Sequence, residues 1–371
     1  MPRLEAKVIV TLEELSLLRE AWTTLLKTTE GDNIFLTWEW VYIWCKYYLG
    51  NGQLCTVLFY DDEKRLVGIA PFYIHSSRIF GVLSFKEMRF LGIEEVCPAY
   101  LDFIASDKYR RAVVEAFYER IFGEWRSKWN VLVLSELPAE SLSIDYLTEL
   151  AEHDGKVFQV ADPIPSPIIT LPKHVDEFLA SIGRNERYNL QRKRKRLDRA
   201  GVVSWERITA LPDFSKAMDS FVWLHQTRWE GKGEAGAFKR SRFEAFHQEI
   251  GKLFAEQQWS SIDLLKLDGE PIAGIYGYRY NGRYSYYLPG FNHNVLPEAS
   301  PGTLLLFHCV EQAIASGISE FDLLRGAMPY KLAWASALRR CLTLRIYNRH
   351  LSSGVSMMYG SARDFWKILL R

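Results

Sequence analysis

Hydrophobic and polar positions alternate in patterns that predict both helices and strands in the first half of the chain. Thr11, with Glu14 three residues later, is typical of a capping box, which places a helix start directly after a short strand over 7–10. Two β-like runs, 54–60 and 66–74, are joined by a charged turn and predict a hairpin. The other elements predicted in this half are helix 38–48, strands 83–91 and 100–105, helix 107–122, strand 131–134 and helix 143–153.

The second half repeats this mixture of elements. Asp268-Gly269 and Asn281-Gly282 are two-residue turn signals, and they predict consecutive hairpins. The predicted elements in chain order are helix 185–199, strand 202–208, helices 214–229 and 243–256, strands 262–267, 272–280 and 284–288, helix 302–315 and strand 320–324.

The two halves look like copies of one unit. Residues 66–70 read like residues 272–276, and both runs are the second strands of predicted hairpins. Each half then continues through strand, helix and strand, which predicts a duplicated α+β unit. Prolines repeated within 162–167 forbid a helix there and favour an extended linker. We therefore expect two domains, 1–160 and 168–371.

Composition narrows the functional classes. A hydrophobic fraction of 48% and a net charge of +1 describe a folded chain without an overall field that would recruit nucleic acid or membrane. Five scattered cysteines without a CxxC pair predict neither a zinc site nor a disulfide framework, and no metal is expected. No apolar stretch is long enough for a signal peptide or a membrane span, so a cytoplasmic location is expected.

The run Ser300-Pro301-Gly302-Thr303 is the first candidate site. Ser is a preferred N-cap and Pro a preferred first helical residue, so Ser300 predicts a helix start. Backbone N–H groups at Gly302 and Thr303 would then attract phosphate. An ordinary capped helix is the alternative. Full Walker and dinucleotide glycine patterns are absent, which disfavours a nucleotide hydrolase or a dehydrogenase.

A second candidate follows strand 320–324. Asp322 and Arg325 stand at the end of this strand, where α/β folds place ligands. Arg325 and Lys331 could hold an anion, and Tyr330 could donate a proton. Trp334, which follows them in the chain, is a further candidate for substrate binding. The alternative is a structural Asp322–Arg325 pair plus an aromatic anchor.

Two helices supply further candidates. His225, Arg228 and Trp229 lie near one helical face and could form a wall of an acceptor site, or Trp229 could simply pack that helix. Helix 185–199 is strongly basic and places Leu190 and Leu197 on the opposite face. That basic face could bind phosphates, acidic glycans, RNA or anionic lipid, or it could be only a solvated surface. Its cations are Arg184, Arg187, Arg192, Lys195 and Arg199.

Several of these motifs together resemble a known family. The runs Tyr286-Tyr287-Leu288-Pro289-Gly290-Phe291, Ser300-Pro301-Gly302-Thr303 and Asp322-Leu323-Leu324-Arg325-Gly326 with Tyr330-Lys331 resemble the CelD-like acyltransferases of the GNAT superfamily. These look like relatives of the Fem-type peptidoglycan peptide transferases. The resemblance implies tandem GNAT-like α+β domains, each a mixed, mostly antiparallel sheet flanked by helices.

The resemblance also implies a reaction. An acyl group, most simply acetyl from acetyl-CoA, would move to an amine or hydroxyl of a small-molecule, glycan or peptide acceptor, in some relatives during exopolysaccharide or envelope synthesis. Asp322 would orient or deprotonate the acceptor, and Tyr330 or Tyr287 would donate a proton. Ser300, Gly302 and Thr303 would bind the donor, and Arg325 and Lys331 an anionic group.

Two other functions stay open. An aminoacyl-tRNA-dependent transferase would use the basic helix for tRNA, and the incomplete GNAT pyrophosphate motif keeps this donor in view. A non-catalytic glycan-binding protein would use tryptophans as stacking platforms.

Overall fold

The structure, a computed structural model, describes residues 3–79 and 83–348. Two compact units divide the chain at Pro163/Ile164 and again at Arg339/Arg340. The first unit therefore includes residues 340–348, whereas the expected second domain ran on through 371. The difference arises because strand β15 (Ala337–Tyr347) continues beyond Arg339 and, from Cys341 onward, pairs with a strand of the first unit. Residues 349–371 lie outside the described part.

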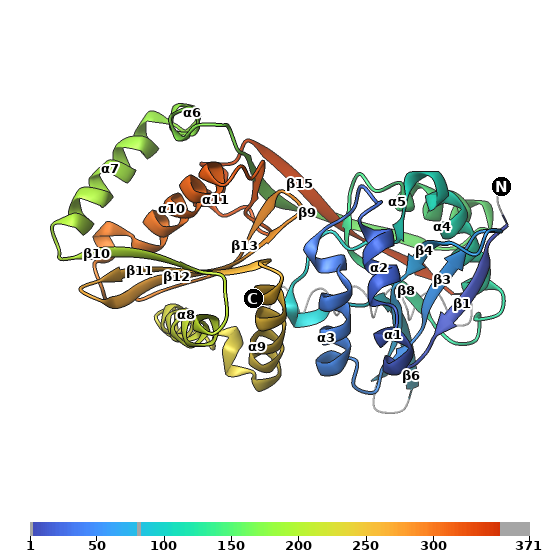
Figure 1. Cartoon of the computed structure of the whole chain (residues 1–371). Helices are drawn as coiled ribbons and strands as arrows, with labels where there is room; N and C mark the ends of the chain where they lie inside the picture. The colour runs from blue at the N-terminus through green and yellow to red at the C-terminus, as the bar shows by residue number, and fades with distance from the viewer. Residues whose placement is uncertain (1–2, 80–82, 349–371) are drawn as a thin grey trace. The chain divides into compact units, whose positions relative to one another are not determined.

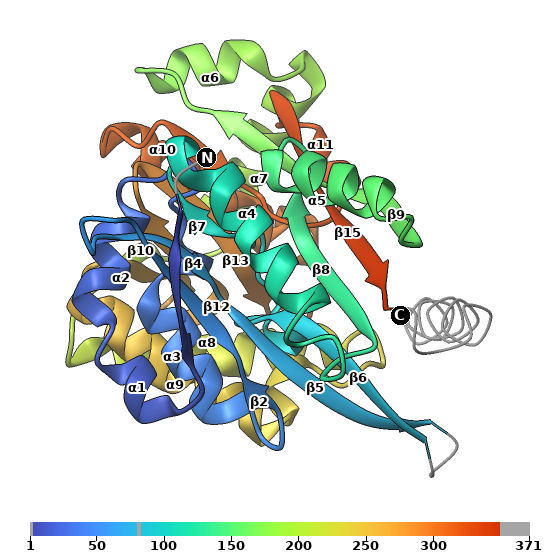
Figure 2. The same cartoon turned by 90° about the vertical axis from the view of Figure 1, so that its right-hand side faces the viewer.

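The strands of the first unit fall into two groups, with helices between them in the chain (Figure 2). Strands β1, β3, β4 and β7 form one antiparallel sheet, and β2, β5, β6, β8 and β15 follow one another in a second set. Strands β6 and β8 run parallel and are connected through α4. The elements are β1 (Glu5–Ile9), α1 (Leu12–Ser16), α2 (Arg19–Leu26), η1 (Ile34–Leu36), α3 (Trp38–Tyr48), β2 (Gln53–Leu54), β3 (Thr56–Tyr60), β4 (Leu66–Ala70), β5 (Phe72–Ile79), β6 (Leu83–Phe90), η2 (Glu94–Val96), β7 (Ile104–Ala105), α4 (Asp107–Phe122), β8 (Val131–Pro138) and α5 (Leu142–His153).

The second unit has six strands in the order β10, β11, β12, β13, β14, β9. Helices α8 and α9 lie on one face of this sheet, and α7 and α10 lie on the other (Figure 1). Strands β13 and β14 run parallel and are connected through α10. The elements are β9 (Phe158–Thr170), α6 (Val175–Ser181), α7 (Arg184–Asp198), β10 (Val203–Ile208), α8 (Asp213–Glu230), η3 (Ala237–Lys239), α9 (Ser241–Glu256), β11 (Ser260–Leu267), β12 (Glu270–Tyr280), β13 (Arg283–Phe291), η4 (Pro297–Ala299), α10 (Pro301–Ala315), β14 (Glu320–Asp322) and α11 (Pro329–Leu332).

The predicted duplication is confirmed by this strand order. In each unit an antiparallel run of strands leads to a parallel pair joined by a helix, β6–α4–β8 in the first and β13–α10–β14 in the second. The predicted two-residue hairpin turns also form. Asp268 and Gly269 have φ values of 50° and 89°, and Asn281 and Gly282 have 47° and 70°, as type I′ turns require.

Two sequence expectations need correction. The proline stretch 162–167 is not a free linker but part of β9, where the carbonyls of Pro165 and Pro167 accept N–H groups from Gly326 and Leu323. Proline lacks only the donor, so it can still accept on one side of a strand. Strand 100–105 shrinks to β7, because Tyr100 has a φ of 61° and its carbonyl accepts a hydrogen bond from Asn33 Nδ2 at 3.0 Å.

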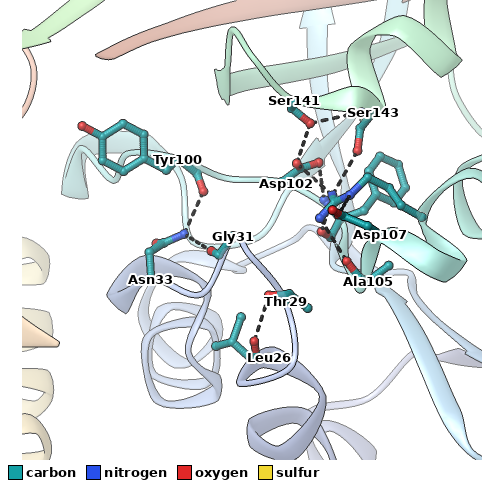
Figure 3. A network of polar contacts seen from close by, with 12 residues as sticks. Leu26, Thr29, Gly31, Asn33, Tyr100, Asp102, Ala105, Asp107, Ser141 and Ser143 are labelled. Carbon is teal, nitrogen blue, oxygen red and sulfur yellow. Dashed lines mark hydrogen bonds and ion pairs between the residues drawn. The ribbon is translucent and has the colours of Figure 1, made fainter. Parts of the chain in front are cut away.

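A buried polar network surrounds the start of α4 in the first unit (Figure 3). The Arg110 guanidinium lies 3.1 Å from the Asp102 carboxylate and donates to the Ala105 carbonyl at 3.0 Å. The Ser141 hydroxyl donates to the same carboxylate at 2.6 Å. Burial raises the pKa of Asp102, and the neighbouring Arg110 partly opposes that rise. The arginine therefore compensates a carboxylate that water does not reach.

This network generates a stability prediction. Replacing Arg110 with Ala leaves the Asp102 charge buried without its cation, so the free energy of unfolding should fall by about 3–5 kcal/mol in urea titrations. Arg111→Ala is the matched control, because the neighbouring Arg111 forms more exposed ion pairs with Glu115 and Glu149 and should cost about 1 kcal/mol or less. Equal losses in the two variants would contradict a special role for the buried pair.

Candidate functional site

A cavity of about 350 Å³ lies where β13 ends and α10 begins, within the second unit. Its walls come from the end of β13, η4, the first turn of α10, the last turn of α8 and the start of α11. Arg228, Lys232 and His293 line it, whereas no aspartate or glutamate among the described residues does. The cavity therefore favours an anionic ligand.

The first turn of α10 presents its positive end to this cavity. Ser300 occupies the N-cap position with a left-handed φ of 48° and makes no side-chain capping bond, so its side chain lines the cavity instead of closing the helix. Thr303 N–H bonds to the Ser300 carbonyl at 2.9 Å. Among the hydrogen bonds of the described residues, Gly302 N–H has no acceptor. The three residues predicted to bind the acyl donor thus lie together. Of their backbone N–H groups, that of Gly302, and not that of Thr303, is open to an anion.

A β-bulge in β13 decides which tyrosine faces the cavity. The pairing with β12 shifts after Tyr276, so that Leu288 and Tyr286 face consecutive residues of β12 and Tyr287 is the extra residue. Tyr286 lines the cavity, and Tyr287 packs on the other face with its hydroxyl 3.4 Å from His247 Nε2. Tyr287, the alternative proton donor expected from the sequence, is therefore not in the cavity, and Tyr286 was missed.

Tyr330 is the cavity residue best suited to move a proton. It stands on α11, is 36% exposed and interacts with the Tyr286 hydroxyl. Burial raises the pKa of Tyr330, although Tyr286 and Arg228 partly oppose the rise. Its phenol therefore stays protonated at neutral pH and can act as an acid.

Asp322 and Lys331 organise the turn after β14 and do not line the cavity. The Lys331 ammonium donates to the carbonyls of Leu323 at 2.7 Å and Arg325 at 2.9 Å, and burial lowers its pKa to about 8. The fully buried Asp322 carboxylate accepts the Leu324 N–H at 2.8 Å and lies 3.7 Å from Arg339. The expected roles in anion binding and acceptor deprotonation have no geometric support here.

Two neighbouring candidates also stand outside the cavity lining. Arg325 is half-buried in that turn. Trp334 is buried and packs edge-on against Phe178 and Phe307 in the core of the second unit. Trp334, a candidate for substrate binding, therefore lies in this core and not in the cavity lining.

The last turn of α8 brings one of its three candidates into the cavity. Arg228 lines it and donates to the Pro289 carbonyl at 3.1 Å. Trp229 donates its indole N–H to His225 Nε2 at 3.1 Å, and burial lowers the pKa of His225 to about 4, so that nitrogen is an unprotonated acceptor. This helix lies directly on β13, because a Cβ on Gly290 would lie 2.5 Å from the His225 backbone nitrogen.

Helix α7 partly matches its prediction. Leu190 and Leu197 are buried as expected. Arg187 is not free for a ligand, because it donates to the carbonyls of Leu179 and Ile182 at the end of α6. The other four cations of the basic face are exposed: Arg184, Arg192, Lys195 and Arg199.

The described residues contain no group of three metal-ligating side chains. Within the described ranges, 3–79 and 83–348, no helix is long and apolar enough to cross a membrane.

Comparisons with known proteins show which families and folds this chain resembles. Residues 184–332 match a family model described as an acetyltransferase (GNAT) domain, and the whole cavity lies within that range. The second unit is therefore similar to an acetyltransferase (GNAT) domain over this range. A search of curated proteins gave no match.

Solved structures extend the likeness to the whole chain. FemX is similar with a TM-score of 0.63 at 13% identity, over 91% of this chain and 96% of that one. L-PGS from Bacillus licheniformis is similar with a TM-score of 0.52 at 13% identity, over 91% and 94%. A conserved protein of unknown function from Bacteroides thetaiotaomicron gives 0.55 at 10% identity, over 92% and 100%. At such identities the likeness shows the fold, and the expected tandem GNAT-like fold is confirmed.

The geometry of Lys331 generates a second prediction. Lys331→Met keeps the length of the side chain but removes the donors to Leu323 and Arg325, so the free energy of unfolding should fall by about 2–4 kcal/mol. Ligand affinity of the folded fraction should stay within about twofold of the wild type, a change of under 0.5 kcal/mol. Lys239→Met, which removes an exposed lysine paired with Glu230, is the control. A stable variant with weakened ligand binding would restore Lys331 as a binding residue.

Proposed function

We propose that the cavity binds the phosphate end of an acyl-CoA and that the chain transfers the acyl group, in the simplest case acetyl, to an amine or hydroxyl. One observation carries this proposal: the positive end of α10 opens into a cavity that also holds two cations and a protonated tyrosine. Gly302 N–H and the Ser300 hydroxyl would receive a donor phosphate. Apolar side chains of Phe291, Pro289 and Leu306 line the remaining wall and suit the pantetheine arm.

The proposed reaction needs no covalent intermediate with the enzyme. The acceptor nitrogen or oxygen attacks the thioester carbonyl, a C–N or C–O bond forms, and the C–S bond breaks. Tyr330 would give its phenolic proton to the leaving thiolate and regain one released by the acceptor through solvent. His293 lines the cavity and could accept the acceptor's proton first. We assign this step to His293 rather than to Asp322, because the Asp322 carboxylate is fully buried away from the lining.

The exposed surface of α7 supports a second class of acyl donor, aminoacyl-tRNA. Its exposed cations Arg184, Arg192 and Lys195 stand on a helix that packs against η4, where Arg196 donates to the Glu298 carbonyl at 3.1 Å. An aminoacyl-tRNA could use them, since phosphate contacts dominate nucleic-acid affinity. A binding experiment in which tRNA and coenzyme A compete for this protein distinguishes the two donors.

Donor binding can be tested at Gly302. A Cβ there would already lie 3.1 Å from the Phe291 ring, so the larger side chain of Gly302→Val should enter the cavity and obstruct the helix end. Calorimetric titration with coenzyme A should show affinity reduced about tenfold or more, which is at least 1.4 kcal/mol. Gly183→Val is the control, because nothing lies within 4 Å of a Cβ on Gly183. Unchanged coenzyme A binding in the Gly302 variant would contradict the proposed donor site.

The proton donor can be tested at Tyr330. Tyr330→Phe removes only the hydroxyl, so release of coenzyme A from acetyl-CoA with an amine acceptor should slow by about 10²-fold, with donor affinity unchanged. Tyr188→Phe, at a 64% exposed position on α7, is the matched control. Normal turnover of the Tyr330 variant would show that solvent protonates the leaving group.

A further inference from the structure

Two cations that line the cavity share one aromatic ring. The Arg228 guanidinium lies 5.5 Å from the centroid of the Trp229 ring, and the Lys232 ammonium lies 5.0 Å from the same ring. Arg228 also lies 5.3 Å from the centroid of the Phe291 ring, so two aromatic rings lie near its guanidinium. Both cations line the cavity, and Trp229 itself does not.

The arrangement holds Arg228 in one orientation. One terminal nitrogen donates to the Pro289 carbonyl at 3.1 Å. Its Nε is buried and has no hydrogen-bond partner among the described residues, which is costly for a charged donor unless a ligand supplies an acceptor. Trp229 is oriented in turn by its hydrogen bond to His225 Nε2. The arginine is therefore fixed before any ligand binds, which lowers the entropic cost of binding.

The local charge balance calls for an anion. Two like charges on one indole repel each other, and cation–π attraction of about 0.5–2 kcal/mol each offsets only part of that cost. Within residues 3–79 and 83–348 no carboxylate lines the cavity, and the nearby Glu230 is paired with Lys239 at 3.1 Å. A planar guanidinium fork beside a lysine ammonium suits a phosphate group, which offers several oxygens to both.

We propose that Arg228 and Lys232 form a clamp for a phosphate-type anion and that Trp229 is its positioning residue. The clamp belongs to α8 and the loop after it, and it lines the same cavity as the phosphate site proposed at the start of α10. The inference rests on the proposed function only in assigning the anion to a substrate. That anion is either a second phosphate of the donor or a phosphate of the acceptor.

The test measures binding of inorganic pyrophosphate, alone and with saturating coenzyme A, and binding of coenzyme A itself. Arg228→Gln and Lys232→Gln should each weaken pyrophosphate binding about tenfold or more. Lys216→Gln, which removes an exposed cation from the same helix, is the control and should change it less than twofold. Trp229→Leu should weaken binding by the folded fraction about fivefold. Trp229→Phe loses the same indole N–H but should recover most of the binding, because a ring remains. Trp223→Leu, at an exposed position of the same helix, controls for loss of a tryptophan.

The outcomes separate the sources of the anion. Loss of coenzyme A affinity in the Arg228 variant assigns the clamp to the donor. Retained coenzyme A affinity, with pyrophosphate binding lost in its presence, assigns the clamp to the acceptor. Pyrophosphate binding that is insensitive to both Arg228 and Lys232, or equal in the leucine and phenylalanine variants of Trp229, overturns the clamp. A wild-type chain that binds pyrophosphate through Arg228 but not coenzyme A overturns the proposed donor and leaves the clamp standing.

Discussion

The crossover between two parallel strands is the constraint on which the candidate site depends. Parallel neighbours cannot be joined by a tight turn, so the chain must leave the end of β13 and return to the start of β14 through a helix. That geometry puts the first turn of α10 beside the end of β13. In the first unit, α4 connects β6 to β8 in the same way. The positive end of a helix and the last residues of a strand thereby share one space, and in the second unit that space is the cavity.

The same crossover exists in the first unit, but its chemistry is different. Helix α4 begins with Asp107, whose carboxylate would repel a phosphate, and Arg110 fills the interior with bonds to Asp102 and Ala105. The second unit has no acidic residue in the first turn of α10 and has Gly302 where a side chain would intrude. The same fold thus has a buried polar network at the start of α4 in the first unit and a cavity at the start of α10 in the second.

The sequence was sufficient for the fold because its signals are local. The Asp-Gly and Asn-Gly turns, the Thr11–Glu14 capping box and the repeated strand order all depend on neighbours in the chain. The site was predicted only in part. Turn, capping and motif patterns singled out five residues that line the cavity: Arg228, Ser300, Gly302, Thr303 and Tyr330.

The differences between expectation and structure share another cause. Three nearby carbonyls, not its charge, decide where the Lys331 ammonium points. The exchange of Tyr287 for Tyr286 depends on a bulge that only the pairing with β12 creates. Such features are set by partners distant in the chain, and residue type alone does not reveal them.

The path of β9 and β15 bears on how the chain is made. The strand beside β8 in the first unit is supplied by residues 341–347, whereas the strand beside β14 in the second unit is supplied by residues 168–170, which directly follow the first unit in the chain. During synthesis the first unit therefore lacks one strand of its sheet until almost all of the second has been translated. Until then β8 presents an open edge to the cell, a template for wrong pairing. A fragment that ends between the two units would therefore expose the unpaired edge of β8 and would be prone to aggregation.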